Sequence, residues 1–199
     1  MSKNSEQLNK IINATVEDVA DVNVWLLSRY FLSKESWTGM TIEPGREHYR
    51  LLSYISYLYN GSRLYDMGTY KGCSAVALSH NPANLVVSYD INNLVQTKRP
   101  DNVEFRLGNY FNDAEAILKS PFIFYDVDPH DGQLEYTTVD FLKSIKYNGL
   151  VLFDDIKVNN EMKKFWNSID LPKHDLTHIG HWSGTGIVDF SGKTKNKLK

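Results

Sequence analysis

Acidic residues follow two apolar runs of the sequence, 122–127 and 150–153. They are Asp126, Asp128 and Asp131 at and after the end of the first run, and Asp154 and Asp155 after the second. If the runs are neighbouring strands, Asp126, Asp154 and Asp155 converge at one edge of a sheet. Carboxylates in such close quarters raise one another's pKa, and a cation usually holds them. Oxygen ligands without cysteine favour a hard ion, so we predict Mg²⁺, with Ca²⁺ or Mn²⁺ as alternatives.

The other interpretation of these aspartates is that they are solvated loop carboxylates. Asp128 or Asp131 in particular would suit the N-cap of a helix that begins near Leu134. His130 lies among the same carboxylates. An imidazole with an unperturbed pKa of about 6.5 suits proton transfer at neutral pH, so His130 is the predicted general base. The alternative is an ordinary surface histidine.

A glycine turn follows the first apolar run of the alternating region. The stretch 63–72 contains Asp66, Gly68 and Gly72, and it is predicted to pass from strand to turn to helix. Gly68 permits a tight turn and a close approach of a ligand to the backbone. A dinucleotide site would need a further glycine at position 70, which is Tyr70 here, so dinucleotide binding is disfavoured. Asp90 ends the next strand, where a carboxylate accepts hydrogen bonds from ribose hydroxyls.

From Arg63 onward, strand-like and helix-like segments alternate along the sequence. The predicted strands are 64–67, 85–90, 103–107, 122–127 and 150–153, and the predicted helices are 74–78, 92–97, 113–118, 134–145 and 161–169. Such alternation indicates a parallel sheet covered by helices on both faces. A strand-like stretch ending at His181, a turn at Ser183-Gly184 and a run from Thr185 to Phe190 predict an antiparallel hairpin. Before the sheet, helices are predicted over 16–32 and 46–59, with a loop over 33–45.

Composition sets the class of protein. The 199 residues carry 22 basic and 24 acidic side chains, a net charge of −2, and one cysteine, Cys73. This balance argues against bulk nucleic-acid binding, and a single cysteine excludes an internal disulfide or a cysteine-based zinc cluster. No apolar run approaches a membrane span, and the N-terminus lacks the apolar region of a secretory signal. We therefore expect a soluble, cytoplasmic, single-domain protein.

The constellation of Asp66, Gly68, Gly72 and Asp90 resembles the cofactor site of class I S-adenosylmethionine-dependent methyltransferases. The resemblance covers residues from about 43 to 190. It implies an α/β fold with a Rossmann-like doubly wound sheet of about seven strands, helices on both faces and a C-terminal antiparallel hairpin. It also implies that Asp66 and Gly68 face the methionine part and Asp90 the ribose. The implied cofactor residues are Glu43, Asp66, Gly68, Gly72, Asp90, Asn109 and Asp126.

The carboxylate pattern is similar to that of metal-dependent O-methyltransferases of the catechol type and their relatives that methylate sugars. That likeness implies Asp126, Asp154 and Asp155 as metal ligands. The catechol subgroup has a lysine base just after the fourth-strand aspartate, whereas this chain has Asp128-Pro129-His130. Relatives with an Asp-x-Asp-His pattern fit better, with Pro129 inserted. The implied catalytic residues are therefore His130 and Asp126.

The sequence thus predicts metal-assisted methylation of a small-molecule or sugar hydroxyl. The alternatives are an NAD-dependent oxidoreductase, a non-catalytic nucleotide-binding module of the same fold, and methylation of a nitrogen without a metal. Residues 1–60 are expected to form a helical lid or a homodimer surface, residues 61–192 the cofactor-binding core, and residues 193–199 a flexible basic tail.

Overall fold

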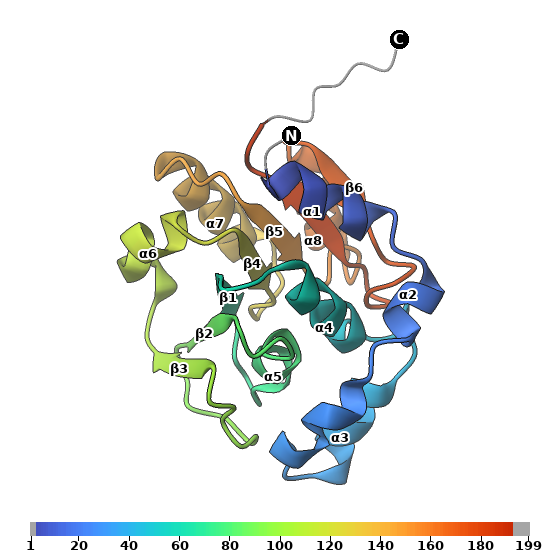
Figure 1. The fold of residues 1–199 in the computed structure, drawn as a ribbon. Helices are drawn as coiled ribbons and strands as arrows, with labels where there is room; N and C mark the ends of the chain where they lie inside the picture. Colours follow the sequence, from blue (N-terminus) through green and yellow to red (C-terminus); the bar gives the residue numbers. More distant parts are fainter. Residues whose placement is uncertain (1–2, 193–199) are drawn as a thin grey trace.

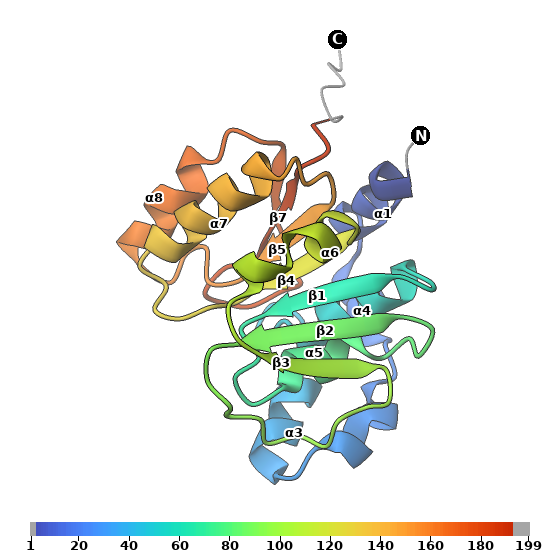
Figure 2. The same cartoon turned by 90° about the vertical axis from the view of Figure 1, so that its left-hand side faces the viewer.

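A seven-stranded sheet forms the centre of the molecule in a computed structural model that describes residues 3–192. The strands lie in the order β3-β2-β1-β4-β5-β7-β6 (Figures 1 and 2). Their bounds are β1 Arg63–Met67, β2 Leu85–Asp90, β3 Val103–Leu107, β4 Phe122–Tyr125, β5 Leu150–Phe153, β6 Lys173–Asp175 and β7 Gly186–Asp189. The strands β1 to β5 pair in parallel, and β7 runs antiparallel to both β5 and β6. This confirms the predicted α/β sheet with an antiparallel C-terminal end.

Helices cover both faces of this sheet (Figure 2). On the face of α4 and α5 the chain forms α1 Lys3–Ile12, α2 Val16–Ala20, the 3₁₀ helix η1 Val24–Tyr30, α3 Lys34–Thr41, α4 Tyr49–Leu58 and α5 Cys73–Leu78. On the other face it forms the 3₁₀ helix η2 Tyr110–Asp113, α6 Ala114–Leu118, α7 Gln133–Ser144 and α8 Asn160–Ser168.

Alternation along the strands divides the core into two clusters. Leu64 packs with the helices of the α4 and α5 face, whereas its neighbour Tyr65 packs with those of the α7 and α8 face. Phe122 and Ile123 divide in the same way on β4. Because successive strand side chains point to opposite faces, nearly continuous apolar strands supply both layers.

The amino-terminal helices belong to the first of these clusters. Leu8, Ile11, Val19, Val24 and Leu27 are buried and share one core with the sheet residues of that face. The apolar faces of these helices, which have no obvious place in the central sheet by sequence, are therefore part of the core. The assignment of residues 1–60 as a lid or dimer surface stays a prediction, and the predicted basic tail at 193–199 lies outside the described residues.

Four local predictions were wrong. The single helix over 16–32 is two pieces, α2 and η1, broken at 21–23. The predicted loop over 33–45 contains α3, which Ser33 caps by accepting a hydrogen bond from the Ser36 N–H at 3.1 Å. Residues 92–97 form no helix, since the Gln96 N–H donates to the Lys71 carbonyl oxygen and Thr97 pairs with Phe31. The predicted tight turn at 183–184 is part of a longer connection between β6 and β7, spanning residues 176–185.

The order of the strands decides where a ligand can bind. β1 has β2 on one side and β4 on the other, so the chain direction across the sheet reverses at β1. At such a reversal the connections leave on opposite faces, and a crevice opens beyond the carboxyl ends of the strands. Among residues 3–192, no helix has the length and apolar character needed to cross a membrane.

Candidate active site

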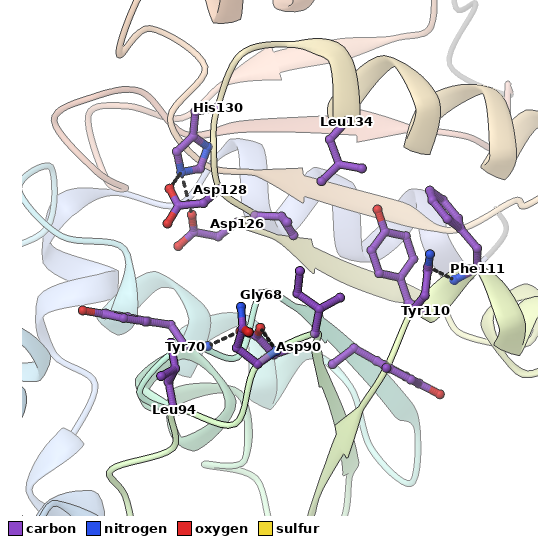
Figure 3. Close-up of a pocket in the computed structure, with 16 residues that line it drawn as sticks. Gly68, Tyr70, Asp90, Leu94, Tyr110, Phe111, Asp126, Asp128, His130 and Leu134 are labelled. Carbon is purple, nitrogen blue, oxygen red and sulfur yellow. Dashed lines mark hydrogen bonds and ion pairs between the residues drawn. The ribbon is translucent and has the colours of Figure 1, made fainter.

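A cavity of about 410 Å³ lies beyond the carboxyl ends of β1, β2, β3 and β4 (Figure 3). Five of the residues predicted to be catalytic or to bind the cofactor line it, and they are Gly68, Asp90, Asn109, Asp126 and His130. In the close-up, Asp126 and His130 lie at one end of the cavity, and Asp90 lies across from them. The predicted nucleoside site and the predicted cation site therefore meet at Asp126, whereas Asp154 and Asp155 lie outside the cavity lining.

Gly68 allows the crevice to exist. Its φ of +99° belongs to the left-handed region, and a Cβ added there would lie 1.7 Å from the carbonyl oxygen of Asp126. The N–H groups of Gly68 and Thr69 donate to the carbonyl oxygen of Tyr89 at 2.9 and 3.1 Å. These contacts hold the turn against the ends of β2 and β4 and leave bare backbone facing the cavity. Gly72, in contrast, packs against Thr97 and Phe105 and is absent from the cavity lining.

Asp90 is held rigidly at the end of β2. Its Oδ2 accepts a hydrogen bond from the Tyr70 N–H, and its Oδ1 accepts one from the Asn92 N–H, both at 2.8 Å. A carboxylate fixed by two backbone donors still has lone pairs for ligand hydroxyls. The Tyr70 side chain, at the position of the missing dinucleotide glycine, is 58% exposed and lines the cavity. Asn109 lines the other end, where its Oδ1 accepts the Phe111 N–H at 2.9 Å.

Besides Gly72, two predicted cofactor residues lie away from the cavity lining. Asp66 is fully buried beneath it, where its Oδ2 accepts a hydrogen bond from the Ser88 hydroxyl at 2.5 Å. Burial raises the pKa of the Asp66 carboxyl to about 6, against the smaller opposing effect of Ser88. Glu43 is exposed and does not line the cavity. The acidic residue of this segment that reaches the site is Glu47, four positions further along.

The raised pKa of Asp66 predicts a pH-dependent cost to folding. Its carboxyl ionises at lower pH in the unfolded chain than in the folded chain, so its effect favours folding below about pH 4 and is lost as pH rises through about 6. Asp66→Asn removes this dependence. Relative to the wild type, its free energy of unfolding should rise by about 3 kcal/mol between pH 4 and pH 7. Urea unfolding at several pH values measures this, and the exposed Asp140→Asn should show no such trend.

The aspartates of the predicted metal site do meet, because the ends of neighbouring strands hold them. The Asp126 N–H donates to the carbonyl oxygen of Met67 on β1, and the Asp154 N–H donates to that of Tyr125 on β4, both at 2.9 Å. Asp154 is 3% exposed, and its Oδ1 accepts a hydrogen bond from the Thr185 hydroxyl at 2.9 Å. His130 Nε2 lies 3.5 Å from Asp126 Oδ1 and 3.3 Å from Asp155 Oδ2.

Two histidines that the sequence analysis missed complete this cluster. His48 Nδ1 lies 3.0 Å from Asp154 Oδ2 and 3.1 Å from Glu47 Oε1. His181 Nδ1 lies 3.2 Å from the same Asp154 oxygen and 2.7 Å from the Ser183 hydroxyl oxygen. The two imidazole rings face each other edge to face, with centroids 5.6 Å apart.

The chain brings these histidines in from two distant segments. The N–H groups of Ile156 and Lys157 donate to the carbonyl oxygens of Gly184 and Ser183, which holds the connection from β6 to β7 beside the end of β5. His48 directly precedes α4, and the turn before it passes so close to this connection that a Cβ on Gly45 would lie 2.8 Å from the His178 carbonyl oxygen. Neither histidine is marked by a local motif, because its neighbours in space are far away in sequence.

The histidines and carboxylates shift one another's protonation. Burial by itself lowers the pKa of His48, but Asp154 and Glu47 outweigh it and raise the value to about 9. In the same way, Asp154 and Asp155 raise the pKa of His181 to about 10. Burial raises the pKa of Asp154, but His48 and His181 hold it well below its usual range. Burial, with the charge of Asp154, raises the pKa of Asp126 to about 7.

The same residues fit a divalent cation. Four sets of three side chains each place their ligand atoms within 4.8 Å of one another. They are Glu47, His48 and His181; His48, Asp126 and Asp154; Asp126, His130 and Asp155; and Asp154, Asp155 and His181. Buried polar atoms without a hydrogen-bond partner, both ring nitrogens of His48 and Oδ1 of Asp155, lie in these sets. Each set contains a histidine besides the predicted carboxylates, and the metal and its ligands stay a prediction.

Backbone geometry marks the same region. Of the four non-glycine residues with positive φ in residues 3–192, three lie at the site, namely Tyr70 at 42°, His130 at 51° and Asp155 at 57°. Such conformations cost on the order of 1–3 kcal/mol each and persist where the surrounding structure fixes them.

Comparison with known proteins finds similarity in structure. No protein-family model matches the sequence, and no match was found among curated proteins. Among solved structures, the chain resembles a cofactor-bound protein, Rv0187 from MTB, at 11% identity and a TM-score of 0.51, covering 94% of this chain and 95% of that one. It also resembles an SAH-bound methyltransferase of Podospora anserina, PaMTH1, at 16% identity and a TM-score of 0.50, covering 89% of this chain and 97% of that one. With the strand order described above, these likenesses show that the chain has the class I fold of S-adenosylmethionine-dependent methyltransferases.

Proposed function

We propose that this protein transfers a methyl group from S-adenosylmethionine to a hydroxyl group of a small molecule or sugar, with the help of a divalent metal ion. One observation carries the proposal. Asp126 and His130 belong both to the lining of the nucleoside-sized cavity and to the cluster of carboxylates and histidines. A methyl donor in the cavity and an acceptor hydroxyl at the cluster would therefore meet at these two residues.

The cavity suits a cationic nucleoside. Asp90 faces it with a carboxylate fixed for ribose hydroxyls, and Gly68 offers unobstructed backbone beside it. Ile91, Leu94 and Leu134 supply apolar surface for a base or a thioether. Carboxylates on both sides of the space, Asp90 and Asp126, favour a positively charged sulfonium and ammonium over a phosphate.

In the transfer, the carbon–sulfur bond of the sulfonium breaks as a bond from the acceptor oxygen to the methyl carbon forms. The products are S-adenosylhomocysteine and a methyl ether, and the hydroxyl proton must leave to a base. His130 is the base that we propose. Its Nε2 faces Asp126 and Asp155, while its Nδ1 lies 3.7 Å from Oε1 of the fully buried Glu135. These carboxylates fix the orientation of the ring.

Charge decides when His130 can accept a proton. Burial lowers its pKa, but Glu135, Asp126 and Asp155 outweigh burial and raise it to about 9, so the ring is protonated at neutral pH in this arrangement. Positive charge bound among the same carboxylates offsets their pull on the ring. A divalent ion held by Asp126, Asp154 and Asp155 with the neighbouring histidines would supply that charge, lower the pKa of an acceptor hydroxyl and orient its oxygen.

Ligand binding tests the proposed cofactor. S-adenosylmethionine and S-adenosylhomocysteine, each at about 100 times its dissociation constant, should raise the melting temperature by about 5 °C or more, and NAD should not. Asp90→Asn should weaken S-adenosylhomocysteine binding by about 10- to 100-fold, since it removes a charge-assisted hydrogen bond to ribose. The exposed Asp101→Asn is the control and should bind like the wild type. Stabilisation by NAD alone would contradict the proposal and favour an oxidoreductase.

Activity tests the reaction class. Transfer of a labelled methyl group to a panel of catechols, other phenols and sugars should depend on an added divalent ion and stop on chelation. Binding of S-adenosylmethionine without transfer to any hydroxyl acceptor would instead support a non-catalytic module. Transfer that persists after chelation would contradict metal assistance.

A further inference from the structure

We propose that His48 and His181 are metal ligands, and that together with Glu47 and Asp154 they form a mixed nitrogen and oxygen site that selects a first-row transition ion over Mg²⁺. The inference rests on the proposed function for the use of the ion, whereas ion binding itself is tested without cofactor or acceptor. The four residues come from the start of α4, the end of β5 and the connection from β6 to β7.

Three distances that involve His48 and His181 are those between adjacent ligands of one ion. A metal bond of roughly 2.1 Å to imidazole nitrogen or carboxylate oxygen places neighbouring ligand atoms roughly 3.0 to 3.4 Å apart. From His48 Nδ1, Asp154 Oδ2 lies at 3.0 Å and Glu47 Oε1 at 3.1 Å. From His181 Nδ1, the same oxygen of Asp154 lies at 3.2 Å. All three distances match the edges of such a coordination polyhedron.

The surroundings of the His48 ring suit a metal ligand. His48 is 3% exposed, and neither of its ring nitrogens has a hydrogen-bond partner, although two carboxylate oxygens lie close to Nδ1. An ion bound by Nδ1 and by the neighbouring oxygens would give this nitrogen a partner. Leaving a buried imidazole unpaired would otherwise cost about 1–3 kcal/mol.

The chemistry of the donors decides the class of ion. Mg²⁺ prefers oxygen ligands and keeps several waters, whereas neutral imidazole suits Mn²⁺, Fe²⁺, Co²⁺, Ni²⁺ or Zn²⁺. Two neutral imidazoles and the two carboxylates of Glu47 and Asp154 carry a charge of −2, which one divalent ion balances. The carboxylates alone would accept either class, so the selectivity must come from His48 and His181.

Binding of Co²⁺ and Mg²⁺ to the tag-free, chelator-treated full chain tests this selectivity by isothermal titration. We expect one Co²⁺ per chain, bound at least about 100-fold more tightly than Mg²⁺. His48→Gln and His181→Gln should each weaken Co²⁺ binding by about 10- to 100-fold and change Mg²⁺ binding by less than about 3-fold. The matched control is His80→Gln, another buried histidine, which packs on Tyr57 outside the cluster and should change neither affinity.

X-ray absorption at the cobalt edge gives a direct readout of the ligands. The wild type should show two imidazoles bound to the ion, and each variant should show one. Circular dichroism and melting of the ion-free proteins verify folding, and the partly exposed His181 provides a variant outside the core. Absence of stoichiometric Co²⁺ binding, unchanged Co²⁺ affinity in both variants, equal losses for Mg²⁺, or a spectrum without imidazole would each overturn the proposal.

The outcomes separate this inference from the proposed function. If S-adenosylhomocysteine binds and the histidine variants bind Co²⁺ like the wild type, the histidines serve only as ion-pair partners of Asp154, and the inference fails while the cofactor proposal stands. If Co²⁺ binds through imidazole but no sulfonium cofactor binds, the metal site stands and the methyltransferase proposal fails.

Discussion

Asp154→Asn is expected to reduce metal-dependent methyl transfer by about 100-fold or more and to leave the affinity for S-adenosylhomocysteine within about 3-fold of the wild type. Asp154 does not line the nucleoside cavity, so cofactor binding does not depend on it. It lies at the centre of the cluster, where one of its oxygens is the neighbour of both His48 and His181. Replacing the carboxylate by an amide of the same shape removes the charge that holds a cation there.

Transfer of labelled methyl to the acceptor identified for the wild type, together with titration of S-adenosylhomocysteine, measures the two effects separately. Asp140→Asn, an exposed change on α7, is the matched control and should retain full activity. An Asp154→Asn protein that binds cofactor and transfers methyl at the wild-type rate would show that the cluster does not take part in the reaction. Equal losses of cofactor binding and transfer would instead indicate a disturbed fold.

Gly68→Ala should prevent the chain from forming a stable cofactor site. The added Cβ would lie 1.7 Å from the Asp126 carbonyl oxygen, a backbone atom fixed by the pairing of β1 with β4, and φ at this position is +99°. Neither the steric clash nor the backbone conformation can be relieved by moving a flexible side chain. We expect a loss of at least about 3 kcal/mol in the free energy of unfolding, with cofactor binding abolished.

Gly61→Ala supplies the matched control for this change. Gly61 also has positive φ, +64°, but a Cβ there would meet nothing within 4 Å. Its cost should therefore be limited to the backbone preference, about 1 kcal/mol. Thermal and urea unfolding of both variants measure the difference. Similar stabilities for the two would mean that the turn at Gly68 relaxes freely, and that β1 and β4 do not need to approach so closely.

Local sequence patterns were enough to predict the parallel strands of the central sheet. Strand ends at Asp90, Leu107 and Phe153 fall where the apolar runs end, because a buried parallel strand needs a continuous apolar sequence. Asp90, Asp126 and Asp154 could be predicted as neighbours of a ligand for the same reason, since parallel strands end at a common edge. Their place at the edge of the sheet follows from where each apolar run ends, and that can be read from neighbouring residues in the sequence.

Outside the strands, contacts with distant parts of the chain set the conformation of several segments. Residues 92–97 have a helix-like spacing, but a hydrogen bond from the Gln96 N–H to the Lys71 carbonyl oxygen and the pairing of Thr97 with Phe31 tie the end of the segment to other parts of the chain. The resemblance implies Glu43 as a cofactor residue. After the turn at Gly45, however, Glu47 is the acidic residue that reaches the cluster. The pattern of residues along the sequence does not reveal which distant segments come into contact.

The order of the elements, the glycine turn and the aspartates at the strand ends can be predicted from sequence, because each depends on residues close together in the chain. The positions of His48 and His181 beside Asp154 arise only when the chain folds. Their approach requires β7 to insert between β5 and β6, and the connection of β6 to β7 to pack against both the end of β5 and the start of α4. Such long-range packing follows from the whole core, and it places a histidine in every set of three side chains whose ligand atoms lie close enough together for one ion.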